Sequence, residues 1–135
     1  MYNYNEINTV HLEITQHCNA ACPMCDRNEN GGLDNQHIRD NLQELTLNDC
    51  IDIFPHDFIA QLKTMYMCGN LGDPISARDT LEVMQWFRDC NPDMWLSMNT
   101  NAGMQSAEWW GDLARVIGRN GCVIFSVDGL EETNH

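Results

Sequence analysis

The chain has 135 residues, a length that suits one domain with its own hydrophobic core. Its 20 Asp and Glu residues outnumber its 7 Lys and Arg residues, and the resulting formal charge of −13 opposes binding to nucleic acid or to anionic membranes. The sequence has no secretory signal pattern and no apolar run of membrane-spanning length, so we expect a cytoplasmic protein whose seven cysteines stay reduced.

The first predicted strand leads directly into a cysteine-rich loop. Val10, Leu12 and Ile14 alternate with polar residues, which is the two-residue period of a strand. Three cysteines follow in the spacing C-x-x-x-C-x-x-C, namely Cys18, Cys22 and Cys25. Three thiolates on one loop are soft ligands that can hold an iron-sulfur cluster or zinc, and the absent fourth ligand leaves a coordination position open.

A polar segment separates the cysteines from the next predicted helices. Residues 26–45 have few apolar anchors and contain two adjacent glycines, so we expect a mobile loop, or a lid, within the domain. Thr46, with Asp49 three positions later, is an N-cap signal for a short helix. That helix runs into Pro55, which we expect at the first helical position of the next turn.

Three further strands are predicted to alternate with two helices. The strands are expected at 64–68, 95–101 and 122–128, and the helices follow N-cap signals at Asp79 and Ser106. Residues 69–74 (GNLGDP) end the first of these strands, because their glycines and proline interrupt regular structure. This βαβαβαβ order predicts parallel strands with helices on the outer face of the sheet.

The two faces of the predicted sheet differ in polarity. One face should pack against the helices, with the rows Val10, Leu12, Ile14, Leu96, Met98, Thr100, Val123, Phe125 and Val127. The opposite row is mostly polar: His11, Glu13, Ser97, Asn99, Asn101, Ser126 and Asp128. Burying such groups unpaired would cost about 1 to 3 kcal/mol each, so we expect them to line a wet ligand-binding concavity in part of a barrel. A flat open sheet is the alternative.

Four stretches of the chain resemble motifs of the radical S-adenosylmethionine (radical SAM) enzymes. They are the cysteine spacing after the first strand, the turn 69–74, which is similar to the family's Gly-Gly-Glu motif, and the stretches 99–103 and 126–129. The resemblance implies an α/β fold, a partial (βα) barrel with four parallel strands and outer helices that lacks the last strands. Residues 1–135 are then expected to be the amino-terminal portion of a longer core domain.

The resemblance also implies two cofactors, a 4Fe-4S cluster and S-adenosyl-L-methionine. Cys18, Cys22 and Cys25 match the three cluster ligands, and the family reductively cleaves S-adenosylmethionine to a 5′-deoxyadenosyl radical that abstracts hydrogen from a substrate. The implied catalysis needs no residue beyond the cluster and cofactor. Residues at positions that match cofactor contacts are Met24, Gly69, Asn70, Gly72, Asp73, Asn99, Ser126 and Asp128.

The implied partners are a substrate, either a peptide or a small molecule, and an electron donor such as flavodoxin or ferredoxin. Two alternatives to an active enzyme stay open at this point. One is a non-catalytic zinc or iron-sulfur module in which His17 or Cys68 supplies a fourth ligand. The other is an inactive, truncated product.

Overall fold

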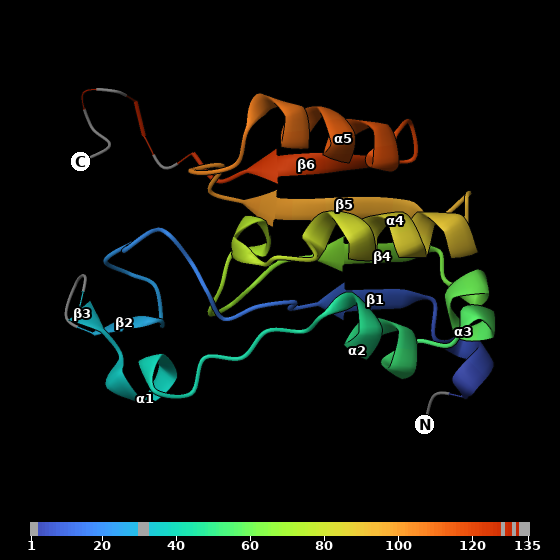
Figure 1. Ribbon diagram of the computed structural model, residues 1–135, viewed down its shortest axis with the longest axis horizontal. Coiled ribbons are helices and arrows are strands. Elements are labelled where there is room, and N and C mark those ends of the chain that lie inside the picture. Colours follow the sequence, from blue (N-terminus) through green and yellow to red (C-terminus); the bar gives the residue numbers. More distant parts are fainter. Residues whose placement is uncertain (1–2, 30–32, 128, 131, 133–135) are drawn as a thin grey trace.

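A parallel four-stranded sheet in the order β1-β4-β5-β6 forms the centre of the protein (Figure 1). Its strands are β1 (Thr9–Leu12), β4 (Thr64–Met67), β5 (Trp95–Thr100) and β6 (Gly121–Phe125). The computed structural model describes residues 3–29, 33–127, 129–130 and 132. The predicted parallel pairing of these four strands is confirmed. Each strand ends earlier than expected, because the chain leaves the sheet to form loops beyond its carboxyl edge.

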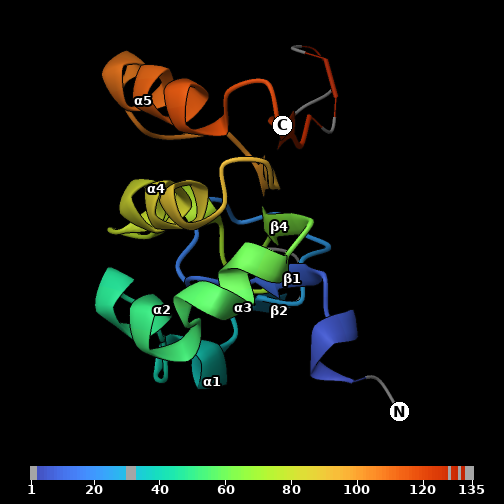
Figure 2. The same ribbon diagram turned by 90° about the vertical axis from the view of Figure 1, so that its right-hand side faces the viewer.

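Four helices cover one face of this sheet (Figure 2). They are α2 (Leu47–Ile53), α3 (His56–Gln61), α4 (Thr80–Cys90) and α5 (Ala107–Ile117). Short 3₁₀ turns lie at η1 (Tyr4–Glu6) and η2 (Pro74–Ser76). Within the described part of the chain, no helix has the length and apolar character needed to cross a membrane.

The segment 26–45 lies beyond the carboxyl end of β1 and contains short regular elements (Figure 1). Strands β2 (Asn28–Glu29) and β3 (Leu33–Asp34) pair antiparallel, and α1 (Gln36–Arg39) follows them. Next to them, Thr15 and Glu44 form an antiparallel bridge that ties the end of this segment to the chain after β1. Its role as a lid stays a prediction.

The hydrophobic core lies between the sheet and its helices. The largest fully buried side chains include Met65, Met67, Leu96 and Met98 from strands and Ile59, Met84, Phe87 and Leu113 from helices. The rows of β1 and β5 therefore face the helices as predicted. Cys50 and Cys90 are also buried in this core, and burial raises the pKa of the Cys50 thiol to about 11.

The apolar row of β6 is less buried than the sequence predicts. Phe125 contacts the Trp110 ring of α5, with 5.7 Å between ring centroids, yet it is 53% exposed, and Val127 is 74% exposed. The reason is that β6 is an edge strand and Val127 lies after its end. On the opposite face, which we call the inner face, Ser97 is buried rather than wet, because neighbouring strands flank it on both sides.

Side-chain caps mark the starts of two of the four covering helices, α2 and α5. Thr46 forms the predicted capping box with Asp49, and the Ser106 hydroxyl accepts from the Trp109 N–H at the start of α5. Pro55 is the N-cap of α3 rather than its first residue. Asp79 occupies the N-cap of α4, as predicted, but its side chain accepts no hydrogen bond from the first turn of that helix. The predicted start of α4 is therefore correct, whereas the predicted side-chain cap is wrong.

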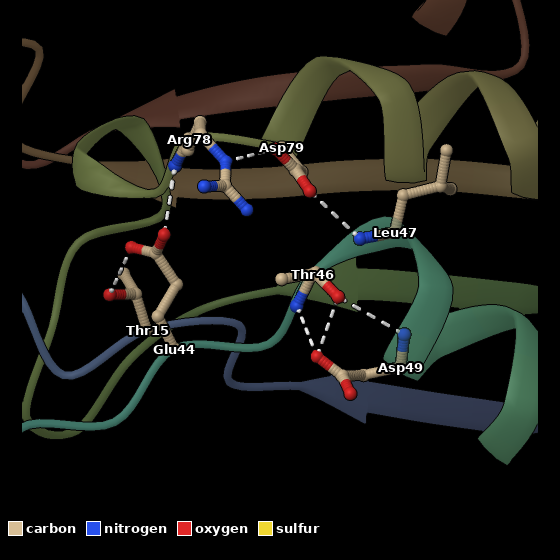
Figure 3. A network of polar contacts seen from close by, with 7 residues as sticks. All are labelled: Thr15, Glu44, Thr46, Leu47, Asp49, Arg78 and Asp79. Atoms are coloured by element: carbon tan, nitrogen blue, oxygen red, sulfur yellow. Dashed lines mark hydrogen bonds and ion pairs between the residues drawn. The ribbon is translucent and has the colours of Figure 1, made fainter.

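The Asp79 carboxylate instead joins two helices (Figure 3). It accepts from the Leu47 N–H at the start of α2 at 3.0 Å and from Arg78 Nε at 2.8 Å. These bonds, with the Arg78 bond as the larger cause, lower the pKa of the Asp79 carboxyl. Nearby, Glu44 accepts from the Thr15 hydroxyl at 3.1 Å, so side chains tie α2, α4 and the end of β1 together.

We expect Asp79→Asn to lower the urea midpoint of unfolding at pH 7. A carboxyl whose pKa is lower in the folded state stabilises above its unfolded pKa, and this contribution is lost as the pH falls through the folded pKa. The difference between variant and parent should therefore persist down to about pH 5 and shrink below about pH 4. Asp89→Asn is the control, since Asp89 accepts from Gln85 on the surface of the same helix. A deficit for Asp79→Asn that is independent of pH would contradict the argument.

Candidate functional site

Three loops meet beyond the carboxyl ends of β1, β4 and β5. We call them the cysteine loop (residues 16–27), the glycine turn (69–74) and the β5 loop (101–105). The Asp73 N–H donates to the His17 carbonyl at 2.8 Å, and the Asn101 N–H donates to Asp73 Oδ2 at 2.7 Å. The Cys25 thiol lies 4.0 Å from the Asn70 carbonyl oxygen. The structure thus brings together three of the four stretches that the sequence singled out, namely the cysteine loop, the glycine turn and the stretch after β5.

The cysteine loop holds its three thiols in different surroundings. Cys18 and Cys25 are partly buried, whereas Cys22 is exposed. The Cys25 N–H donates to the Cys22 carbonyl at 3.1 Å, and Asn28 Nδ2 donates to the same carbonyl at 3.0 Å, so a tight turn fixes the backbone between these two cysteines. The Ala20 N–H donates to Cys18 Sγ at 3.4 Å.

The charge state of Cys18 depends on opposing influences. Burial, the largest cause, raises the pKa of the Cys18 thiol, and the Asp73 charge adds to this effect. The Ala20 N–H bond and the Arg27 charge act in the other direction. A bound metal would favour the thiolate further, because its positive charge stabilises a deprotonated ligand.

A buried arginine anchors the cysteine loop to the glycine turn. Arg27 is 9% exposed, and its Nη1 donates to the carbonyls of Gln16 and Leu71, the latter at 3.0 Å. Its Nε is buried without a partner in the described structure. The motifs in the sequence do not include this residue. The available signal was an Arg two residues after the last cysteine of the motif, in an otherwise mostly uncharged or acidic segment.

The glycines of the turn are required by contacts with the protein's own backbone. A Cβ atom on Gly72 would lie 2.0 Å from the Thr15 carbonyl oxygen, and one on Gly69 would lie 2.1 Å from the Gly72 carbonyl oxygen. Backbone atoms cannot rotate away as a side chain can, so larger residues do not fit at either position. Close packing of the turn against the chain after β1 therefore explains both glycines.

Two inner-face side chains, His11 in β1 and Glu13 directly after it, hold the glycine turn from the other side. The Glu13 carboxylate accepts from the Asn70 N–H at 3.1 Å and also from the Asn70 side-chain amide. His11 stacks on Tyr66, and its Nε2 donates to the Cys68 carbonyl at 2.7 Å. His11 Nε2 and Glu13 Oε1 are 4.0 Å apart, too far for a hydrogen bond.

Asp73 is enclosed among the three loops. It is 5% exposed, and its Oδ1 accepts from the Ile75 N–H at 3.1 Å while its Oδ2 accepts from Asn101. Both oxygens thus bond to backbone N–H groups in this structure, so the carboxylate stabilises the loops. Its predicted contact with an amino group of a cofactor stays a prediction.

The remaining predicted site residues lie at the margins of this assembly. Met24 is 95% exposed on the cysteine loop, and Ser126 is exposed after β6, with its N–H donating to the Thr100 carbonyl at 2.8 Å. The partly buried Asn99 side chain bonds to the Cys68 thiol, whose pKa is raised mainly by burial. Asp128 lies outside the described residues.

The donor set suits an iron-sulfur cluster. Within the described residues, no three His, Cys, Asp or Glu side chains are already arranged around a common metal position. The cysteine loop nevertheless carries three free thiols, and N–H groups donate to the sulfur of Cys18, as suits a thiolate ligand.

Comparison with known proteins identifies the fold. No protein-family model and no curated protein matches the sequence. The structure is similar to BtrN, a radical SAM enzyme, in its crystal structure with AdoMet and 2-DOIA, with a TM-score of 0.55 and 16% sequence identity. The match covers 91% of this chain and 47% of the BtrN chain, so this chain spans about half of that protein. The fold is that of a partial radical SAM barrel.

This partial radical SAM barrel confirms the fold class expected from the sequence. Its sheet is unclosed and has β1 and β6 as edges. The cysteine loop follows the first of its four strands, and the glycine turn follows the second. Both motifs therefore stand at the same edge of adjacent parallel strands, which is where ligands bind in open α/β sheets.

Proposed function

We propose that this chain is the amino-terminal part of a radical SAM enzyme, with a 4Fe-4S cluster on Cys18, Cys22 and Cys25 and S-adenosylmethionine beside the glycine turn. The observation that carries the proposal is the meeting of the two motifs, with 4.0 Å between Cys25 Sγ and the Asn70 carbonyl oxygen. The similarity of the fold to BtrN, whose structure contains AdoMet, supports it. Once bound, the cluster and cofactor supply reductive cleavage to a 5′-deoxyadenosyl radical that abstracts hydrogen from substrate.

The residues of the chain would bind and orient these groups. The Asn70 carbonyl provides an acceptor beside the cysteine loop, and Glu13 fixes the peptide unit before it through the Asn70 N–H. Asp73 holds the glycine turn against the cysteine loop and the β5 loop. The polar side chains His11 and Glu13, about one-third exposed on the inner face, provide contacts for a polar substrate.

We also propose a substrate class, an electron donor and a cellular location for this enzyme. A peptide or small polar molecule suits a wall of His, Glu and Asn side chains, and a net charge of −13 argues against nucleic acid. A flavodoxin or ferredoxin would supply the electron in the cytoplasm. Because the chain spans about half of BtrN, the substrate of the whole enzyme would also depend on parts that this chain does not contain.

Anaerobic reconstitution with iron and sulfide tests the proposal. We expect about four irons per chain and a change in the EPR signal of the reduced cluster when S-adenosylmethionine is added. Reduction with dithionite in its presence should then release 5′-deoxyadenosine if these four strands suffice to hold the cofactor productively. Stoichiometric zinc in tetrahedral coordination, with no effect of S-adenosylmethionine, would instead favour a non-catalytic zinc module.

A further inference from the structure

Asn101 connects the β5 loop to the cysteine loop through both ends of its side chain. Its Nδ2 donates to Cys18 Sγ at 3.6 Å and to Asn19 Oδ1 at 3.0 Å. Its Oδ1 accepts from the Gly103 N–H at 2.7 Å, and its own N–H donates to Asp73. The side chain of one residue after β5 is therefore tied to a predicted cluster ligand far away in the sequence.

The orientation of this amide follows from its partners. The Gly103 N–H can only donate, so it requires the oxygen of the amide on its side. The amide nitrogen must then face Asn19 Oδ1 and the sulfur of Cys18. The amide lies close to Gly103, since a Cβ there would lie 2.7 Å from Asn101 Oδ1 and would displace that side chain.

We propose that Asn101 is a positioning residue that sets the reduction potential of the cluster through its N–H···S bond to Cys18. The inference rests on the proposed function. Adding an electron to a cluster increases the negative charge on its sulfur ligands, and a hydrogen bond to a sulfur stabilises that charge. The bond therefore favours the reduced cluster, which is the form that donates an electron to S-adenosylmethionine.

Two substitutions of Asn101 separate this bond from the order of the loop. Asn101→Ala removes the donor without adding charge. Asn101→Asp also removes the donor but keeps an oxygen that can accept from the Gly103 N–H. Asn19→Asp is the matched control, since it adds the same charge near Cys18 and keeps the acceptor for Asn101. The measurements are iron per chain and the midpoint potential of the reconstituted cluster in an EPR-monitored redox titration.

We expect both Asn101 variants to shift the midpoint potential to more negative values, with Asn101→Asp shifting further than Asn19→Asp. Loss of iron from a variant whose circular dichroism is unchanged would also support the positioning of Cys18. If either Asn101 variant does not fold, the other decides. Full iron content with an unchanged potential would overturn this inference alone, whereas failure of the unsubstituted protein to take up a cluster would overturn the proposed function as well.

Discussion

Replacing Cys22 with alanine is expected to abolish cluster binding while the chain keeps its fold. The thiol of Cys22 is exposed, and the hydrogen bonds that fix its turn go to its backbone carbonyl, which alanine retains. Two remaining thiolates cannot hold the three irons that need protein ligands. Iron analysis after anaerobic reconstitution should fall from about four to below about one per chain, with an unchanged far-UV circular dichroism spectrum.

Cys122 provides the matched control for this experiment. It is also a free, incompletely buried cysteine, but it lies on β6, paired with Ser97 within the sheet and away from the loops. Cys122→Ala should keep the full iron content of the parent. If Cys22→Ala also kept its full iron content, Cys22 would not be a ligand, and the assignment of the C-x-x-x-C-x-x-C loop as the cluster site would fail.

The sheet and its helices follow from local patterns in the sequence. Alternating apolar residues predict three of the four sheet strands, and caps such as Thr46 and Ser106 predict where helices begin, because these signals act over a few residues. The pattern does not show where a strand leaves the sheet. Asn101 continues the alternation of β5, yet its N–H bonds to Asp73, a contact set by the tertiary fold.

The sequence motifs of the candidate site were predictable, but the hydrogen bonds that join those motifs were not. Spacing located the cysteines and the glycine turn, since ligand geometry and close backbone approach restrict which residues occur there. The functions of Glu13, Arg27 and Asn101 depend on partners tens of residues away, as in the bond from Asn70 to Glu13. Such pairings appear only when the strands are placed side by side.

Asp73 shows that a side chain singled out by a motif can also have a structural role that the motif does not reveal. The sequence placed an acidic side chain at the end of the glycine turn and assigned it to a cofactor. In the structure, that carboxylate is enclosed by backbone N–H groups from two segments. An acidic residue after the glycine turn looks the same in the sequence whether its carboxylate faces a ligand or accepts from buried N–H groups. The sequence alone therefore cannot distinguish these two roles.

Gly72→Ala is expected to destabilise the protein and to weaken binding of S-adenosylmethionine. The added Cβ would lie 2.0 Å from the Thr15 carbonyl oxygen and 2.9 Å from that of His17, so the glycine turn must move away from the cysteine loop. Overpacking of this kind costs about 1 to 3 kcal/mol. The movement would also strain the bond from the Asp73 N–H to His17 and separate Asn70 from Cys25.

Gly111→Ala is the matched control, with the opposite sign. Gly111 lies within α5, and a Cβ there would meet only Arg115 Nη2, at an ordinary 3.9 Å. Alanine in a helix interior is more stable than glycine by about 0.5 to 1 kcal/mol. Urea unfolding should therefore place Gly72→Ala below and Gly111→Ala above the parent. Because Gly111 lies within the covering helix α5 and its added Cβ would contact none of the three loops, its variant should also keep the cofactor-induced EPR change, which Gly72→Ala should lose. Equal stability of the two variants, with the EPR change kept in both, would show that the glycine turn does not need its close contact with the cysteine loop to bind the cofactor.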